Sequence, residues 1–199
     1  MRVFQRACVR AGVRVKYSQG FNPHQRMSLV LPRSVGVESD DEMLCLWLDD
    51  GEAGFDVESL KDELPEGIEI VSARISATKK VPEPSSARYV IKVKGTDKGI
   101  SERIAEILAS KEITVERQMG EDSRIKMVDV RPFLESISVQ GGDVVVDCKV
   151  SPAGTIRVDE ILGLLQLGVE DLAQAVRRTG VQWGDLNGGC EVKAVIDNT

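Results

Sequence analysis

The 199-residue sequence contains a single histidine and few aromatic residues, which make up only 4% of the chain. It has no apolar run of 18 or more residues, so it lacks a candidate membrane-spanning helix. The patterns GxxxxGKS/T, GxGxxG and HExxH are all absent. The usual sequence support for nucleotide hydrolysis, dinucleotide binding and zinc proteolysis is therefore missing.

The cysteines are few and widely separated, at Cys8, Cys45, Cys148 and Cys190. Zinc sites and iron-sulfur clusters need closely spaced thiolates or the help of histidine, and His24 is the only histidine. We therefore predict ordinary buried thiols, no bound metal and no cofactor. Free thiols of this kind indicate a reducing, cytoplasmic compartment.

Charge is unevenly divided along the chain, although 26 Lys and Arg against 32 Asp and Glu give a net charge of −6. Residues 1–37 hold seven Lys or Arg and no acid, whereas residues 38–70 hold thirteen acids and one Lys. Arginines at positions 6, 10 and 14 interrupt any apolar run at the start, which argues against a secretory leader. The composition excludes a uniformly basic nucleic-acid binder but leaves room for a local basic surface.

The first half of the chain alternates between helical and strand-like periodicity. The pattern predicts helices over 1–11 and 57–64, strands over 13–17, 43–48 and 68–75, and an apolar run around 27–31. Residues 78–87 contain two prolines and two serines, which is typical of a linker.

The second half predicts strands over 89–93, 113–115, 125–130, 134–139, 144–150 and 176–183, with helices over 100–108 and 158–165. Gly141-Gly142 is the expected hairpin turn between two of these strands. This order is the ferredoxin-like β-α-β-β-α-β with one extra strand or bulged segment.

We therefore predict an α+β protein of two tandem ferredoxin-like (βαββαβ) units, the first lacking its N-terminal strand. The expected boundaries are 1–77 for the first unit, 78–87 for the linker, 88–183 for the second unit and 184–199 for a C-terminal tail. A missing first strand would leave an exposed sheet edge that favours dimerisation or aggregation.

Basic and turn-forming residues mark one candidate interface. Arginines at positions 2, 6 and 10 recur at helical spacing, and the segment Tyr17-Ser-Gln-Gly-Phe-Asn-Pro-His24 combines an aromatic side chain with nearby cations. The candidate partner- or RNA-binding residues are Arg2, Arg6, Arg10, Lys16, Tyr17, Gln19, Phe21, Asn22, His24, Arg26 and Arg131.

Each of these features also has a purely structural interpretation. The arginine stripe is equally explained as a solvated helix face, and the 18–24 segment as a turn whose Phe21 plugs the core and whose His24 bonds a backbone carbonyl. The acidic block between Glu38 and Glu69 is a solvent face, a cover for the basic segment, or a region that repels nucleic acid. Arg131 precedes Pro132 at a strand end and is expected to pair locally with Asp129 or Glu135.

Several segments together resemble the radical SAM-linked protein family of bacteria, whose members lie beside or are fused to radical SAM proteins. The matching segments are Met1-Arg-Val-Phe-Gln-Arg-Ala7, Ala11-Gly-Val13, Tyr17 to His24, Leu31-Pro32, Val35-Gly-Val-Glu-Ser39 and Val128-Asp-Val-Arg-Pro-Phe133. The resemblance is close over most of residues 1–39 and loose over the remainder. Family members begin with a strand and a Ser-His-Leu-Asp-like helix entry that would precede Met1, so we expect about 15 residues of the family pattern to be absent.

The resemblance implies association with a radical SAM protein, and with RNA or a ribosome-related partner, because family members are often encoded near ribonuclease G and large-subunit ribosomal proteins. The chain has no CxxxCxxC motif, so it is not itself the radical enzyme. Three functions stay open at this point. They are a non-catalytic RNA- or substrate-binding accessory module, a metal-free RNA-processing enzyme that uses His24, and a purely structural partner subunit.

Overall fold

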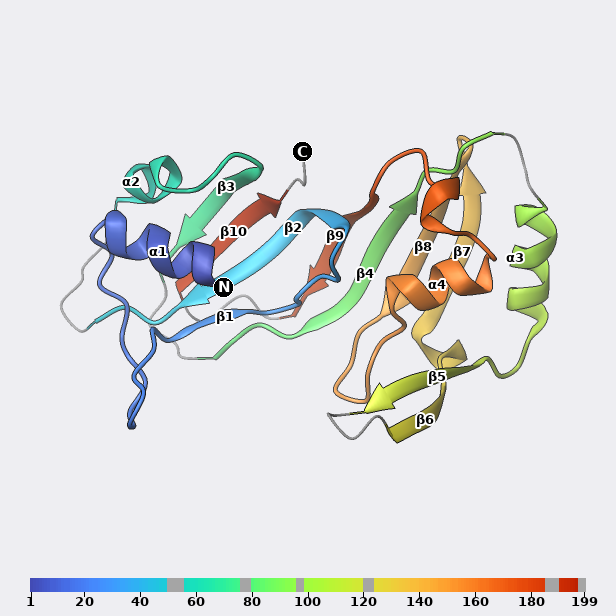
Figure 1. Cartoon of the computed structure of the whole chain (residues 1–199), viewed down its shortest axis with the longest axis horizontal. Coiled ribbons are helices and arrows are strands. Elements are labelled where there is room, and N and C mark those ends of the chain that lie inside the picture. The colour runs from blue at the N-terminus through green and yellow to red at the C-terminus, as the bar shows by residue number, and fades with distance from the viewer. Residues whose placement is uncertain (50–55, 76–79, 96–98, 120–123, 185–189, 197–199) are drawn as a thin grey trace. The chain divides into compact units, whose positions relative to one another are not determined.

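The computed structural model describes residues 1–49, 56–75, 80–95, 99–119, 124–184 and 190–196 (Figure 1). It has a mixed α+β fold that is rich in strands. The chain divides into two compact units, which we describe separately. Unit 1 takes residues 1–33, 38–84 and 183–199, and unit 2 takes residues 34–37 and 85–182.

Unit 1 combines two helices with an antiparallel sheet. Its elements are α1 (Arg2–Arg10), β1 (Met27–Leu29), β2 (Val37–Leu46), α2 (Val57–Asp62), β3 (Ile68–Arg74) and β10 (Cys190–Ile196). Strand β10 pairs antiparallel with β2 on one side and with β3 on the other, while β1 also pairs antiparallel with β2. A strand that is distant in sequence thus lies between β2 and β3.

The core of unit 1 explains why the first residues form an amphipathic helix. Phe4, Ala7 and Cys8 recur at spacings of three and one, so they share one face of α1, and all three are buried. They pack in one apolar cluster with residues of the segment after α1, of the sheet and of α2, namely Val13, Val15, Leu44, Leu46, Leu60 and Ile70. The opposite face of α1 is left to the arginines.

Among the described residues of unit 2, the strands pair in the order β9-β4-β8-β7. Its elements are β4 (Pro84–Ile91), α3 (Ile100–Ala109), β5 (Thr114–Met119), β6 (Arg124–Asp129), η1 (Arg131–Phe133), β7 (Leu134–Gln140), β8 (Asp143–Lys149), α4 (Val158–Leu164), η2 (Val169–Asp171) and β9 (Val176–Trp183). Strands β5 and β6 pair with each other in a separate two-stranded sheet. Apolar residues of α3, α4, β4 and β8 form one core, which includes Ile104, Ile161, Ile91 and Val146.

The predicted α+β class and most predicted helices and strands are confirmed, with boundary shifts of a few residues. The predicted strand over 13–17 is wrong, because this stretch makes only isolated bridges, Val15 with Leu48 and Tyr17 with Gln25. Strand β2 begins at Val37, directly before the acidic block, and runs into that block, while β4 begins at Pro84, inside the predicted linker. The tandem ferredoxin-like arrangement stays a prediction. Linker residues 78–79 and residues 185–189 and 197–199 of the predicted C-terminal tail lie outside the described residues.

Three of the four cysteines, Cys8, Cys45 and Cys148, are buried thiols outside any disulfide, as predicted for packing thiols, while the side chain of Cys190 lies outside the described residues. Among the residues that the structure places, no three His, Cys, Asp or Glu side chains gather as a metal site. No helix in the described ranges is both long enough and apolar enough to cross a membrane.

Candidate functional site

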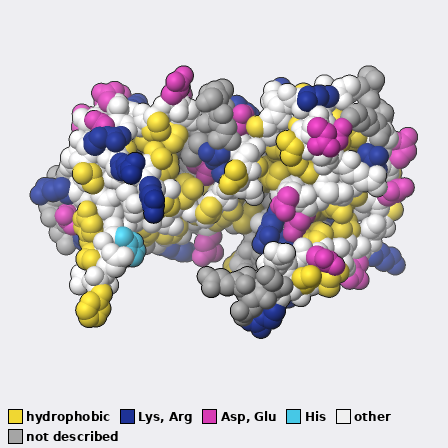
Figure 2. All heavy atoms as spheres, viewed as in Figure 1, with side chains coloured by type: hydrophobic (Ala, Val, Ile, Leu, Met, Phe, Trp, Pro, Cys, Tyr) yellow, Lys and Arg dark blue, Asp and Glu magenta, His cyan; other side chains and the backbone are white. Residues whose placement is uncertain are grey.

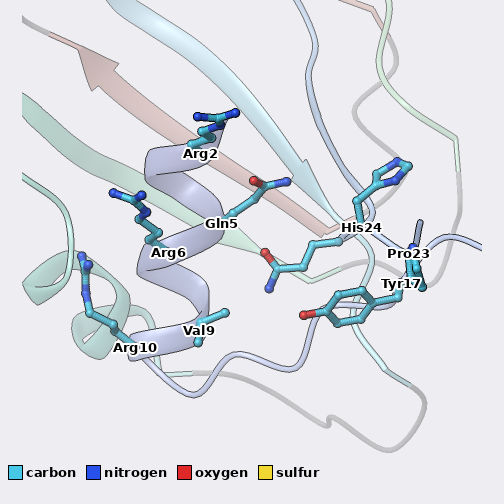
Figure 3. Close-up of a pocket in the computed structure, with 9 residues that line it drawn as sticks. Arg2, Gln5, Arg6, Val9, Arg10, Tyr17, Pro23 and His24 are labelled. Atoms are coloured by element: carbon cyan, nitrogen blue, oxygen red, sulfur yellow. The ribbon is translucent and has the colours of Figure 1, made fainter. Parts of the chain in front are cut away.

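A groove of about 530 Å³ lies between α1 and the 17–25 segment of unit 1, and we call it the α1 groove. In Figure 3 the arginines follow one another along α1, and the ring of Tyr17 points toward the helix from the opposite wall. The groove is lined by Arg2, Gln5, Arg6, Val9, Arg10, Tyr17, Pro23, His24 and Gln25. Five of the predicted site residues, Arg2, Arg6, Arg10, Tyr17 and His24, thus share one concave surface.

The three arginines of α1 have different surroundings. Arg10 donates from Nε to the carboxylate of Glu63 and from Nη2 to the Glu63 carbonyl oxygen at 2.6 Å. Arg2 and Arg6 are exposed, and they make no hydrogen bond or ion pair within the described part of the chain. Arg10 is therefore occupied in holding α1 to the end of α2, whereas Arg2 and Arg6 are available to an anion.

The acidic block supplies partners for part of the basic segment. Glu63 binds Arg10, and Glu42 lies 3.9 Å from Arg33, with the Glu42 side chain fully buried. Internal pairing therefore neutralises two cations of the basic segment and leaves the α1 stripe at Arg2 and Arg6 positive. Figure 2 shows this row of Lys and Arg side chains over α1, with the single histidine near its end.

Residues 17–25 form a hairpin that projects from unit 1, seen as the blue loop in Figure 1. Tyr17 and Gln25 form an antiparallel bridge, and the backbone N–H of Ser18 donates to the His24 carbonyl at 2.8 Å. The His24 backbone N–H donates to Ser18 Oγ at 3.1 Å, and this oxygen lies 3.0 Å from His24 Nδ1. These contacts fix the base of the hairpin.

His24 is positioned by the hairpin, and no carboxylate among the described residues bonds its ring. Ser18 Oγ accepts the His24 backbone N–H and lies 3.0 Å from Nδ1, and the tautomer of the ring decides which of these two groups donates in that second contact. The other neighbour of Nδ1 is the Asn22 carbonyl oxygen at 3.4 Å. Within the described ranges, His24 thus has a hydroxyl partner but lacks the third group that typically orients a catalytic base.

Phe21 lies at the tip of this hairpin, and the interpretation that it plugs the core is wrong. Its exposed fraction is 112%, so it buries nothing against its own chain. Gly20, with φ of +141° and open space around it, permits the bend that carries Phe21 outward. Gln19 and Asn22, which flank this pair, are also exposed.

Six predicted site residues do not line the α1 groove, namely Gln19, Phe21 and Asn22 of the hairpin together with Lys16, Arg26 and Arg131. The backbone N–H of Lys16 donates to the Trp47 carbonyl, and the Arg26 guanidinium lies 5.3 Å from the centre of the Trp47 ring in a cation-π contact. Arg131 belongs to unit 2, where its guanidinium donates to the carbonyls of Ser110 and Leu134 at 3.0 and 3.1 Å. Its backbone N–H, rather than its side chain, meets Asp129. Arg131 therefore secures a turn and is not part of this groove.

Sequence reasoning missed four residues that line the groove: Gln5, Val9, Pro23 and Gln25. The helical spacing of Gln5 and Val9 relative to Arg2 and Arg6 could have indicated them, because residues three and four apart share a helix face. Gln25 is only 7% exposed, and its position depends on the bridge to Tyr17, which no local pattern reveals.

The fold and site define an α+β protein with a basic groove and a projecting aromatic hairpin in unit 1. Residues 1–160 match the family described as "Uncharacterized protein conserved in bacteria (DUF2344)", and the chain belongs to this family. No curated protein matches the chain, and no solved structure does.

Proposed function

We propose that this chain is a non-catalytic accessory module that binds RNA through the α1 groove and works with a radical SAM protein. The observation that carries the proposal is the exposed, unpaired state of Arg2 and Arg6 beside a groove that also presents Tyr17 and His24. Arginine suits phosphate because its planar guanidinium donates several parallel hydrogen bonds. Sugar and base edges would meet the amide and hydroxyl groups of the opposite wall.

Support for the radical SAM partner comes from the resemblance of residues 1–39 and 128–133 to the radical SAM-linked family. The chain would present a substrate and leave the radical chemistry to a separate protein, because it carries no CxxxCxxC motif of its own.

The test of RNA binding is its salt dependence. Fluorescence anisotropy with a short RNA hairpin that carries single-stranded tails is measured from about 50 to about 200 mM salt. The double variant Arg2→Ala/Arg6→Ala is expected to weaken binding and to reduce the slope of log K against log salt by about 1.4, or about 0.7 per single-strand phosphate contact. Arg10 is left intact, since its loss would also disturb the fold.

The matched control is Lys111→Ala/Lys149→Ala, which removes the same charge from exposed positions of unit 2. It is expected to leave the slope unchanged. Equal slopes for both double variants, or no binding to this RNA, would refute the proposal.

A purely structural partner subunit is the alternative among non-catalytic functions. Co-purification with a radical SAM protein that survives ribonuclease treatment and the Arg2→Ala/Arg6→Ala change would favour that alternative. Metal-free RNA cleavage is the enzymatic alternative, for which the contact between Ser18 Oγ and His24 Nδ1 is the relevant observation. Cleavage in EDTA that disappears in His24→Ala would establish it.

We also propose that both units are ferredoxin-like. In unit 2 the path β4-α3-β7-β8-α4-β9, with the β5-β6 ribbon inserted, has the expected order of elements and the sheet order β9-β4-β8-β7. In unit 1, β10 lies between β2 and β3, antiparallel to both, which is the place a first strand would take. A solved structure with a different strand order would refute this assignment.

A further inference from the structure

The 17–25 hairpin presents an apolar aromatic ring to solvent on a fixed base. Phe4 is 6% exposed and Phe133 packs against the core of unit 2, whereas Phe21 is entirely exposed. The Tyr17–Gln25 bridge and the contacts between Ser18 and His24 hold the two arms together below this ring. The ring is therefore displayed by an ordered element and makes no contribution to the core.

The same hairpin forms one wall of the α1 groove, through Tyr17, Pro23, His24 and Gln25. In Figure 2 it extends below the histidine and ends in an apolar side chain. A ligand whose charged backbone lies on Arg2 and Arg6 would thus have a second contact along the hairpin. That contact is flat and apolar, which matches the face of an unstacked nucleobase.

We propose, building on the proposed RNA binding, that the α1 groove and Phe21 together select a single strand of nucleic acid, with phosphates on Arg2 and Arg6 and a base stacked on Phe21. A duplex already stacks its bases on each other and offers its phosphates alone to this site. The ring at the hairpin tip therefore provides selection for a single strand, while the arginines provide affinity for phosphates that does not depend on sequence.

The experiment compares four fluorescein-labelled probes on the full chain by anisotropy at one salt concentration. Two are single strands of equal length, oligo(U) and oligo(dU). The other two are RNA duplexes of the same length, one with blunt ends and one with an unpaired tail. Oligo(U) and the tailed duplex are expected to bind at least about ten-fold more tightly than the blunt duplex. Equal binding of oligo(U) and oligo(dU), with both tighter than the blunt duplex, would support single-strand selection and refute a preference for RNA.

Variants at position 21 test the stacking contact. Phe21→Ala is expected to weaken oligo(U) binding by about 5- to 150-fold, the range for loss of one base-aromatic stack. It should leave the salt slope and the blunt-duplex affinity unchanged. Phe21→Trp keeps a flat ring and should retain affinity, whereas Phe21→Leu keeps apolar area and should lose it. Val35→Ala, at another fully exposed apolar residue, is the matched control and should have no effect.

The outcomes separate this inference from the proposed function. Salt-dependent binding of RNA with equal affinity for single strand and duplex would refute single-strand selection and leave RNA binding intact. Full affinity in Phe21→Leu would refute stacking. Loss of a protein partner in Phe21→Ala, with unchanged oligo(U) binding, would show that the ring docks on protein. Because Phe21 is fully exposed, circular dichroism and thermal melting should be unchanged in each variant.

Discussion

Arg10 and Glu63 join the end of α1 to the end of α2, through two hydrogen bonds from one guanidinium to one residue. Arg6, one helical turn earlier, makes no such contact within the described residues. Both arginines line the α1 groove, but Arg10 also holds two helices together, whereas Arg6 has no such structural role.

Arg10→Ala is expected to lower the free energy of unfolding by about 1 kcal/mol, the size of a partly exposed pair with an added hydrogen bond. Arg6→Ala is expected to leave that free energy unchanged and to weaken RNA binding instead. Urea unfolding and anisotropy on the two variants measure both properties. The assignment of roles is wrong if the two variants lose stability equally.

A largely buried ion pair in unit 2 predicts that the protein loses stability at low pH. Arg117 donates to both carboxylate oxygens of Glu160, at 2.7 and 2.8 Å, and also to the Thr155 carbonyl. Burial alone would raise the pKa of Glu160, but the hydrogen bonds from Arg117 and from the Arg157 backbone outweigh it, so the pKa lies below its ordinary value of 4.5. The ionised form is therefore stabilised by folding, and this contribution is lost as pH falls through the lowered pKa.

Glu160→Gln is expected to lower the free energy of unfolding by about 3 kcal/mol at pH 7. The change leaves the Arg117 charge without its partner, and the Arg117 side chain is only 12% exposed. The difference in the free energy of unfolding between wild type and variant should become smaller as pH falls below 4.5, the ordinary value of the carboxyl pKa. Urea unfolding at several pH values gives this difference. Glu66→Gln, at an exposed carboxylate, is the control and should show no such difference.

Replacing two different glycines by alanine is expected to change stability in opposite directions. Gly142 has φ of +91° in the turn between β7 and β8, where an alanine is strained, so Gly142→Ala should cost about 1–2 kcal/mol. Gly163 lies within α4 with open space at its Cβ position, so Gly163→Ala should stabilise by about 0.5–1 kcal/mol. Thermal melting of the two variants checks both signs, and a loss in Gly163→Ala would show that the helix does not tolerate the methyl group.

The Cys148 thiol is expected to be unreactive in the folded protein. Burial, with smaller effects from Asp147 and Glu135, raises its pKa to about 12. At pH 8 the native protein should therefore hold Cys148 as the neutral thiol and resist iodoacetamide, whereas the unfolded protein should react fully. Mass mapping of labelled peptides measures this difference. Rapid native labelling of Cys148 would contradict the buried position.

The sequence was most informative where apolar periodicity was strong. Ile100, Ile104 and Ile107 indicated α3, and Phe4 with Cys8 indicated α1, because burial of one helix face dictates that spacing. The first half of β2 was not predicted, because its acidic residues interrupt the apolar pattern. In that strand Ser39 and Glu42 are buried, so polar residues occupy positions that the apolar pattern could not reveal.

The candidate site was only partly readable from the sequence. The arginine stripe and the 17–24 segment were identified as interface candidates, since cations and turn residues are local signals. Their meeting in one groove, the capture of Arg10 by Glu63 and the exposure of Phe21 depend on tertiary structure. Local sequence therefore could not distinguish the occupied arginine from the two available ones.

Because β10 is the last strand to be synthesised, the sheet of unit 1 cannot be completed until unit 2 has been translated. The chain leaves unit 1 after β3, builds residues 85–182 of unit 2, and only then returns to insert β10 between β2 and β3. At about 5–20 residues per second, translation of unit 2 imposes a delay on the order of ten seconds. During that time the facing edges of β2 and β3 lack their shared partner, although unit 2 already has all of its residues. The helix that carries the basic groove thus rests on a sheet that is completed only after the other unit has been made.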